Sequence, residues 1–418
     1  MRRSVVRRLR LAGALAALLA PLAACASAPR APQRWSTALA QWSDDGRAVI
    51  LVTGTDEAIE LRAHDGERGE RLWRAAAGGD AARAPIELAV SPDGDRAVYA
   101  SGGALWLAAR GAAEVRRLAG ALRDAASPSL APDGRSVAFT SGGALWVQEL
   151  AASAPQRLTP EAALVPSGGD RPFLTDFRQP GRAPLPYAWS PDSRSLAYFG
   201  VAQGAAPRLW IVDLLAPQPR AVAAAAGPSG TLLRAQWRFD ARGLAVESAT
   251  AGEPLRRLQL CHPEKLYCRE LAQAAWSAGA RLRDDFRFLE NGFLWSGPLG
   301  EPSLARFDTL GRLRGYLVPA EGGPWEIAAL LESSGELLVR SVAERGSDDE
   351  TAGGLVLVGL ADGNRRAVGG ASAADRLAAA ENARSWVRFE SRHGDVERLV
   401  LEALDGRRLA AVFVVPTP

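Results

Sequence analysis

Residues 90–106 read VSPDGDRAVYASGGALW, and residues 130–146 read LAPDGRSVAFTSGGALW. Each stretch holds the end of one apolar strand, a Pro-Asp-Gly turn, a second apolar strand, and a third strand that follows Gly-Gly. Pro presets φ in such a turn, Asp caps it through its side chain, and Gly accepts the positive φ. The short strands are rich in Ala, Val and aromatic residues, which is typical of strands buried on both faces.

The same unit recurs along the chain. The turn aspartates are spaced by 48, 40, 59 and 48 residues, and the stretch SGGALW occurs twice, 40 residues apart. The turn aspartates are Asp45, Asp93, Asp133, Asp192 and Asp240. A unit of three or four strands with a period of roughly 40–50 residues is typical of a β-propeller blade, which packs against its neighbours around a central channel.

Later parts of the chain keep the period but lose the turn motif, over residues 285–318, 325–369 and 386–415. Counted from Trp35, the pattern predicts an all-β propeller of eight blades over residues 35–418, with seven as the alternative. Each blade is expected to have four antiparallel strands, with almost no helix. Most of the twelve tryptophans recur at strand positions and are predicted to be blade core: Trp42, Trp189, Trp237, Trp106, Trp146 and Trp210.

The first residues have the layout of a bacterial secretory signal, with a basic start and a twelve-residue apolar run over 11–22. This run is too short for a transmembrane helix, which needs about 20 apolar residues. It ends in Leu22-Ala23-Ala24-Cys25, which looks like a lipobox. We therefore expect a signal peptide over residues 1–24, lipidation of Cys25, and a tether that completes residues 25–34. The alternative is a plain signal cleaved after Ala24 or Ala26.

The residue after the cysteine bears on localisation. In Gram-negative lipoproteins an Asp at this position usually means retention in the inner membrane, whereas this chain has Ala26. The expected location is therefore the outer membrane, with the protein lipid-anchored and facing the periplasm.

Two further cysteines, Cys261 and Cys268, lie in the stretch LQLCHPEKLYCREL. This stretch predicts two strands joined by a turn at residues 262–265, with the thiols facing each other. Export would place them in an oxidising compartment, so we expect a disulfide with a Cα separation of about 4.4–6.8 Å. Buried reduced thiols are the alternative. A structural zinc site is disfavoured, because it needs four ligands and the pair with His262 supplies too few.

The charge balance argues against a nucleic-acid partner. The whole chain has 50 Lys and Arg against 47 Asp and Glu, but five arginines lie in residues 1–24, which contain no acid. Their removal leaves 45 against 47, a net charge of −2, which is a poor basis for electrostatic binding of nucleic acid. Lys265 is the only lysine, and we interpret the excess of Arg as composition bias, since no Arg cluster in the sequence forms a face. There is no P-loop and no dinucleotide fingerprint, so no cofactor is expected.

The Ser-Pro-Asp turns and the strands that follow them resemble PD40-type repeats, as in TolB-like propellers. The order of segments is more specific: LAPDGRSVAFTSGGALWVQELAASAPQRLTPE, a long insertion, and PYAWSPDSRSLAYFG. Together with FRFLENGFLWSG and the closing VLEALDGRRLAAVF, this order resembles the N-terminal propeller of the dipeptidyl peptidase IV branch of the prolyl oligopeptidase family. The resemblance covers about Trp35 to Val415.

Two departures from this family decide the functional expectation. Its members carry Ser, Asp and His on an α/β-hydrolase domain after the propeller, whereas this sequence has no G-x-S-x-G motif. Members of the family also bind the free amine of the substrate with a Glu-Glu pair about ten residues before the Trp-Ser-Pro-Asp turn. Counted back from Trp189 without gaps, the matching positions in this sequence are Gln179 and Pro180. Asp176 is the nearest acid. The peptidase catalytic domain and the substrate anchor are therefore both expected to be absent.

No catalytic or metal-binding residue is predicted. The three histidines adjoin turn residues and are interpreted as solvated loop side chains: His64, His262 and His393. The acidic clusters lack the alternating spacing of calcium loops and are interpreted as turn or loop charges: Asp44-Asp45, Asp284-Asp285 and Asp348-Asp349-Glu350.

Three functions remain in order of preference. The first is a non-catalytic lipoprotein scaffold whose propeller loops bind a protein or peptide partner. The second is an accessory or split subunit of a separately encoded serine peptidase, which an exposed apolar patch on one rim would favour. The third is an enzyme with a site at the channel mouth, for which no set of convergent groups is visible.

Overall fold

The computed structural model describes residues 36–55, 57–83, 86–112, 114–120, 122–160, 164–165, 172–175, 185–201, 207–222, 230–250, 255–265, 267–275, 286–296, 304–318, 325–331, 334–341, 355–368, 376–378, 385–392, 395–404 and 407–413. The chain divides into two units, residues 1–34 and 35–418, and the described residues all belong to the second. They form 33 strands and one short 3-10 helix, η1(Gly79–Ala82).

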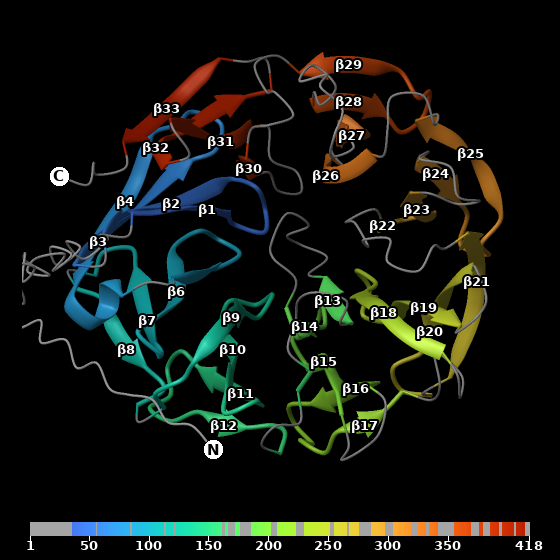
Figure 1. The fold of residues 1–418 in the computed structure, drawn as a ribbon, viewed down its shortest axis with the longest axis horizontal. Helices are drawn as coiled ribbons and strands as arrows, with labels where there is room; N and C mark the ends of the chain where they lie inside the picture. The colour runs from blue at the N-terminus through green and yellow to red at the C-terminus, as the bar shows by residue number, and fades with distance from the viewer. Residues whose placement is uncertain are drawn as a thin grey trace, which may run out of the picture. The chain divides into compact units, whose positions relative to one another are not determined.

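The strands group into eight sheets that follow one another around a ring (Figure 1). Blades 1 and 2 consist of β1(Ser36–Trp42), β2(Ala48–Thr55), β3(Ala58–Asp65), β4(Arg71–Gly78), and β5(Glu87–Val90), β6(Arg96–Ser101), β7(Ala104–Ala109), β8(Arg116–Leu118). Blades 3 and 4 consist of β9(Ala126–Leu130), β10(Ser136–Ser141), β11(Ala144–Glu149), β12(Gln156–Arg157), and β14(Tyr187–Trp189), β15(Ser195–Gly200), β16(Arg208–Asp213), β17(Arg220–Ala221).

Blades 5 and 6 consist of β18(Gly230–Trp237), β19(Leu244–Thr250), β20(Leu255–Cys261), β21(Cys268–Ala275), and β22(Phe286–Leu289), β23(Gly292–Ser296), β24(Leu304–Phe307), β25(Leu313–Val318). Blades 7 and 8 consist of β26(Trp325–Leu331), β27(Glu336–Ser341), β28(Leu355–Gly359), β29(Arg365–Val368), and β30(Arg376–Ala378), β31(Ser385–Arg392), β32(Asp395–Ala403), β33(Arg408–Phe413). The first strand of each blade lies nearest the centre of the ring and the fourth lies outermost (Figure 1). The predicted eight-bladed propeller of four-stranded antiparallel blades is confirmed.

The core is built between blades rather than within them. Each of the eight apolar clusters of buried side chains joins two consecutive blades, and one of them joins blade 8 to blade 1. In that closing cluster Trp42 and Leu51 pack with Val387 and Leu401. Among the described strands, none of blade 8 pairs with blade 1, and the two blades meet by packing of apolar faces, the main favourable term in folding.

The tryptophans separate into two groups by strand position. Trp42, Trp189 and Trp237 end first strands and are at most 2% exposed, so the prediction that they are core is confirmed. The third-strand tryptophans are only partly buried and pack at the edges of the clusters: Trp106, Trp146 and Trp210. The second group therefore contributes to the core only in part, although other side chains of the third strands are fully buried, such as Leu105 and Leu145.

Buried indole N–H groups connect neighbouring blades. Trp189 Nε1 donates to the Ser129 carbonyl at 3.0 Å, which joins blade 4 to blade 3. Trp237 Nε1 donates to the Ala188 carbonyl at 3.2 Å, which joins blade 5 to blade 4. These bonds satisfy polar groups that burial would otherwise leave without a partner.

Two strands were not expected from the sequence. The insertion between blades 3 and 4 contributes β13(Phe173–Thr175), which pairs in parallel with β18 on the inner edge of blade 5. Blade 8 begins with the short strand β30, whereas the sequence placed its first strand at Trp386. Both strands have only three residues, which is too short for a periodic pattern.

The alternating strand directions give the ring two ends. We call one end the turn face, where the first strand of a blade connects to the second and the third connects to the fourth. We call the other end the loop face, where second and third strands connect and where each blade passes to the next. The insertion between blades 3 and 4 leaves and returns at the loop face.

Candidate functional site

Several predicted site residues lie outside the described residues. They are Cys25, Asp176, Gln179, Pro180, His393, Asp284-Asp285 and Asp348-Asp349-Glu350. Asp44-Asp45 lies in the first turn of blade 1, as expected for a turn charge. Within the described part of the chain, no group of three or more His, Cys, Asp or Glu side chains could hold a metal ion.

The expectation of solvated histidines is wrong for His64. This residue lies in β3 and is 7% exposed, and its Nδ1 is 3.0 Å from the Gly69 carbonyl oxygen. Burial lowers the pKa of His64, with Arg62 and Arg71 acting in the same direction against the Gly69 contact. Strand β3 runs to Asp65, and this places His64 inside the blade.

His262 does lie in a turn, where its ring stacks on Tyr267 at a centroid distance of 6.0 Å. The cysteines that flank this turn are directly opposite each other on β20 and β21. The structure joins Cys261 to Cys268 with a Cα separation of 3.9 Å, shorter than the expected range. Opposed residues of an antiparallel pair are ordinarily about 4.5–5.5 Å apart, so strand pairing alone does not account for the shorter separation. Both the export of the protein and the oxidation of this pair stay predictions.

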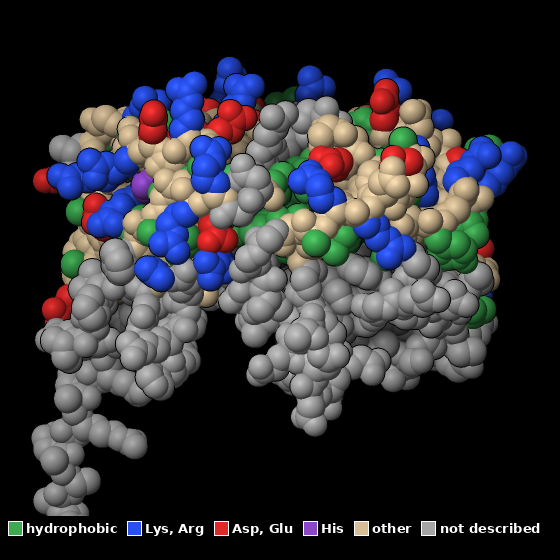
Figure 2. All heavy atoms as spheres, turned by 90° about the horizontal axis from the view of Figure 1, so that it is seen from above, with side chains coloured by type: hydrophobic (Ala, Val, Ile, Leu, Met, Phe, Trp, Pro, Cys, Tyr) green, Lys and Arg blue, Asp and Glu red, His purple; other side chains and the backbone are tan. Residues whose placement is uncertain are grey.

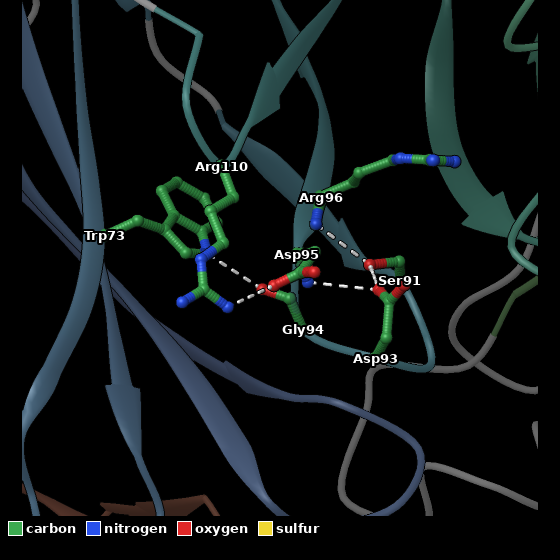
Figure 3. Close-up of polar contacts among 7 residues, drawn as sticks. All are labelled: Trp73, Ser91, Asp93, Gly94, Asp95, Arg96 and Arg110. Atoms are coloured by element: carbon green, nitrogen blue, oxygen red, sulfur yellow. Dashed lines mark hydrogen bonds and ion pairs between the residues drawn. The ribbon is translucent and has the colours of Figure 1, made fainter.

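The turn face is built from repeated hydrogen-bonded turns, of which blade 2 is the clearest (Figure 3). Ser91 Oγ donates to Asp93 Oδ1 at 2.5 Å and accepts the Arg96 amide at 2.9 Å. The same carboxylate oxygen accepts the Asp95 amide at 3.0 Å. Burial alone would raise the pKa of Asp93, but the hydrogen bonds from Ser91 and the Asp95 amide outweigh it and lower the pKa.

Neighbouring elements hold this turn in place. Trp73 Nε1 of blade 1 donates to the Gly94 carbonyl at 2.9 Å, and Arg110 Nη1 donates to Asp95 Oδ1 at 3.3 Å (Figure 3). Gly94 has φ +72°, a left-handed conformation that glycine adopts without strain. The turn carboxylates are therefore occupied within their own turns.

Large exposed apolar side chains gather on the turn face of three consecutive blades. Of the seven found among the described residues, six lie in the turns of blades 4, 5 and 6 or on the strand that follows, and Val201 lies at the opposite end. We call these six the apolar arc: Leu215, Phe239, Tyr267, Leu310, Leu313 and Tyr316. They are 43–90% exposed, and Leu215 is the most exposed. The described turns of blades 1 to 3 carry no such side chain.

Charge divides the turn face in the same way. We count the charges of each turn and of the two residues on either side. Blades 5 and 6 have seven Lys and Arg against four Asp and Glu, a net charge of +3. Blades 1 to 3 have nine against ten, a net charge of −1. Figure 2 views the ring from its side and shows many Lys and Arg side chains along the upper end, so the expectation that no Arg cluster forms a face is wrong.

The turns of blades 5 and 6 form one continuous surface. Arg269 Nη2 of blade 5 donates to the Thr309 carbonyl of blade 6 at 3.3 Å. A Cβ at Gly311 would meet the Leu271 carbonyl oxygen at 1.9 Å, so the blade 6 turn packs directly on the backbone of β21. The exposed side chains Tyr267 and Leu310 are thereby held at neighbouring turns.

A groove of about 500 Å³ adjoins this surface between blades 6 and 7. Its blade 6 wall includes Arg306, Arg314 and Tyr316, and its blade 7 wall includes residues 360–363. Arg306 Nη1 donates to the Leu360 carbonyl at 3.0 Å, which ties the two walls together. The groove is open beside β25, the outermost strand of blade 6.

Blade 5 also contains a buried charged cluster. Glu247 Oε1 lies 3.1 Å from Arg234 Nη2 and 3.7 Å from Arg256 Nη1, and all three side chains are at most 7% exposed. Trp295 of blade 6 donates its indole N–H to the same oxygen at 2.6 Å. Burial alone would raise the pKa of Glu247, but the two guanidinium groups and the hydrogen bonds lower it. The cluster is a structural joint between blades 5 and 6.

Searches by sequence found no match, since no family model and no curated protein resembles the chain. Solved structures do resemble it. Dipeptidyl peptidase 4 of Porphyromonas gingivalis superimposes with a TM-score of 0.66 at 14% identity, over 91% of this chain and 60% of that chain. A putative dipeptidyl aminopeptidase IV from Bacteroides ovatus gives 0.63 at 12% identity, with the same shares.

The dihydro-heme d1 dehydrogenase NirN gives a TM-score of 0.51 at 17% identity, over 79% of this chain and 65% of that chain. The chain thus spans less than two thirds of the length of each of these proteins. It is an eight-bladed β-propeller with the fold of the propeller part of the dipeptidyl peptidase 4 structures, which is the resemblance that the segment order predicted. Since a dehydrogenase has a comparable fold, the fold alone does not define the chemistry.

No helix in the described part of the chain is long and apolar enough to cross a membrane.

Proposed function

We propose that this protein is a non-catalytic propeller scaffold that binds a protein or peptide partner at its turn face. The apolar arc carries this proposal. Single exposed apolar residues are ordinary on a protein surface, whereas a group on one rim marks an interaction site. The arc includes Phe239, Tyr267 and Tyr316, and aromatic side chains supply much of the binding energy of protein interfaces.

The rigid neighbourhood of the arc supports the same proposal. His262 stacks on Tyr267, and the Arg238 guanidinium lies 5.7 Å from the centre of the Phe239 ring. Side chains that are already held by neighbours lose less conformational freedom on binding. The arc is thus organised before a partner arrives.

The test is photo-crosslinking from defined positions. A photoreactive phenylalanine analogue replaces Tyr267 in one protein and Asp133 in a matched control. Both positions are exposed at turn-face turns, in blade 5 and blade 3 respectively. We expect a discrete crosslinked product in the cell envelope from position 267 only. Equal products from both positions, or none from 267, would contradict the proposal.

Absence of peptidase activity is part of the proposal. No described group of side chains combines a nucleophile, a base and an oxyanion hole, which acyl transfer requires. We expect that the purified protein releases no chromogenic amine from an X-Pro substrate. Activity that stays with the protein through a second purification and resists removal of contaminating peptidases would contradict this part.

The lipid anchor is a further part of the proposal, in which Cys25 carries the lipid and the protein faces the periplasm from the outer membrane.

The variant Cys25→Ser tests the anchor. It removes the lipidated thiol, and we expect the protein to move from the membrane fraction to the soluble periplasmic fraction. The same distribution for the wild type and the variant would show that Cys25 carries no anchor.

A second candidate is an accessory subunit for a separately encoded serine peptidase. The observation that favours it is the same apolar rim, since a subunit that docks a second protein needs such a surface. Identification of the product crosslinked at position 267 separates the two. A serine hydrolase supports the subunit, and another envelope protein supports the scaffold.

A further inference from the structure

Three turns of blades 5 and 6 place cations beside the apolar arc. Arg242 lies three residues after Phe239, Lys265 two residues before Tyr267, and Arg312 two residues after Leu310. We call these six residues with Leu313 the basic–apolar patch.

The cations of the patch are available to a ligand. Arg242, Lys265 and Arg312 are exposed, and none of them forms an ion pair within the described part of the chain. The aspartates in two of these turns are engaged, whereas the exposed Glu264 lies beside Lys265 in the third. Asp240 Oδ2 is 3.3 Å from Arg238 Nε, and Asp308 Oδ2 is 2.8 Å from Arg314 Nη2.

These carboxylates also accept backbone amides of their own turns. Asp240 Oδ1 accepts the Arg242 amide at 3.0 Å, and Asp308 Oδ1 accepts the Arg312 amide at 2.9 Å. Each bond holds the backbone of the residue whose cationic side chain is exposed. The turns therefore present free positive charge together with apolar side chains, and the free charge complements an anionic partner.

From this charge complementarity we propose that the basic–apolar patch docks an acidic polypeptide segment that also carries large apolar side chains. The proposal rests on the proposed function and names the chemistry of its partner. The turns of blades 1 to 3, with a net charge of −1 and no large exposed apolar side chain among their described residues, would repel or ignore the same segment.

The geometry favours an extended polypeptide over a lipid surface. The groove of about 500 Å³ beside Tyr316 can take a large side chain, and β25 offers an outer edge to which an extended segment can pair. Gly315 lies in β25 with φ +151°, and a Cβ there would meet no atom within 4 Å, so the backbone is open on the groove side. A flat layer of lipid headgroups would neither fill the groove nor pair with the strand edge.

The test measures fluorescence anisotropy with three labelled twelve-residue peptides. The first contains six Glu with Leu and Tyr, the second has Lys in place of Glu, and the third has Ser in place of Leu and Tyr. We expect the first peptide to bind at least ten-fold more tightly than the other two. Its affinity should fall as salt rises, because the cations of the patch are exposed and screened.

Two variants and one control locate the binding. The variant Arg242→Glu/Lys265→Glu/Arg312→Glu reverses the free cations, and Phe239→Ser/Leu310→Ser removes apolar side chains at the same turns. We expect each variant to bind the first peptide at least ten-fold more weakly than the wild type does. The control Arg47→Glu/Arg68→Glu/Arg135→Glu makes three reversals at exposed turn residues of blades 1 and 3 and should bind like the wild type. Circular dichroism and melting curves verify that all three proteins fold.

The inference is overturned if the Lys peptide binds equally well or if the patch variants bind like the control. It is also overturned by a second outcome, in which the acidic peptide does not bind and phosphatidylglycerol vesicles bind the wild type but not the cation-reversed variant. A crosslinked product at position 267 without any binding of the acidic peptide would refute the acidic partner while the proposed scaffold function stands.

Discussion

The turns of blades 1 to 3 and those of blades 5 and 6 occupy the same end of the ring but differ in net charge and in exposed apolar side chains. In blades 1 and 2 a serine and an aspartate close the turn, with Ser43 Oγ donating to Asp45 at 2.7 Å and Ser91 Oγ to Asp93 at 2.5 Å. In blade 5 the position of that serine is Arg238, and the next residue is the exposed Phe239. Blade 3 has Ala131 at the serine position, and Asp240 of blade 5 still accepts the amide two residues later. The two sets of turns therefore share the aspartate and differ in the side chains around it.

The interiors of the same blades differ as well. The residue seven positions after the turn aspartate is Ala100 in blade 2, Thr140 in blade 3 and Glu247 in blade 5. Blade 5 thus replaces a neutral side chain with a buried charge, and a disulfide crosslinks its outer hairpin. Both features reinforce the blade that carries the first half of the basic–apolar patch.

Removal of the buried carboxylate should have the largest effect on stability. Glu247→Ala leaves Arg234 and Arg256 without their shared buried partner, and breaking a buried ion pair costs about 3–5 kcal/mol. Thr140→Ala, the matched change in blade 3, removes one hydrogen bond to the Ala126 carbonyl and should cost about 1 kcal/mol. Denaturant unfolding of both variants measures the difference. Equal losses would mean that blade 5 gains nothing from its charge cluster.

The same carboxylate makes blade 5 sensitive to acid. Folding lowers the pKa of Glu247 from its ordinary value of 4.5, so the folded state binds fewer protons than the unfolded state. The stabilisation is complete above pH 4.5 and is lost as the pH falls through the lower folded pKa. The loss of stability between pH 5 and pH 3 should therefore be smaller in Glu247→Gln than in the wild type. An identical pH profile would show that this carboxylate does not change its proton binding on folding.

The disulfide should have the next largest effect. It closes a short loop of sequence separation 7, and the entropy of that loop corresponds to about 2.5 kcal/mol. We expect dithiothreitol to lower the unfolding free energy of the wild type by this amount and to leave Cys261→Ser/Cys268→Ser unchanged. A wild type that is insensitive to the reductant would show that the two thiols are not bonded in the purified protein.

The repeat made blades 1 to 5 predictable, because a tight turn with Asp between two apolar strands is a local signal. Asp93 and Asp133 occupy equivalent turns, as the 40-residue period requires. The inner strand β13 could not be found in the same way, since its position depends on pairing with β18 some sixty residues later. The burial of His64 depends likewise on where β3 ends, which the turn residues around it do not define.

The turn-face surface was within reach of the sequence but was missed. Arg follows the turn aspartate by two residues at Arg47, Arg135, Arg194 and Arg242. In a propeller all such turns lie at one end, so the repeat itself indicated that these arginines gather there. Because these arginines are far apart in the sequence, no local cluster indicated that they share one surface. The buried position of Glu247 gave no such signal, because a charged residue within a strand is ordinarily on an exposed face.

The smallest expected effects concern a single backbone position in the two sets of turns. The residue after the turn aspartate has φ +68° at Gly134 of blade 3 and +58° at Ala241 of blade 5. A left-handed conformation costs a non-glycine residue about 1–2 kcal/mol, whereas glycine adopts it freely at some cost in unfolded-chain entropy. We therefore expect Gly134→Ala to destabilise the protein by about 1 kcal/mol and Ala241→Gly to stabilise it by about 0.5–1 kcal/mol. Denaturant midpoints of the two variants measure effects of opposite sign. A loss of stability in both variants would mean that the packing of the Ala241 side chain outweighs its backbone strain. The alanine would then stabilise the blade 5 turn.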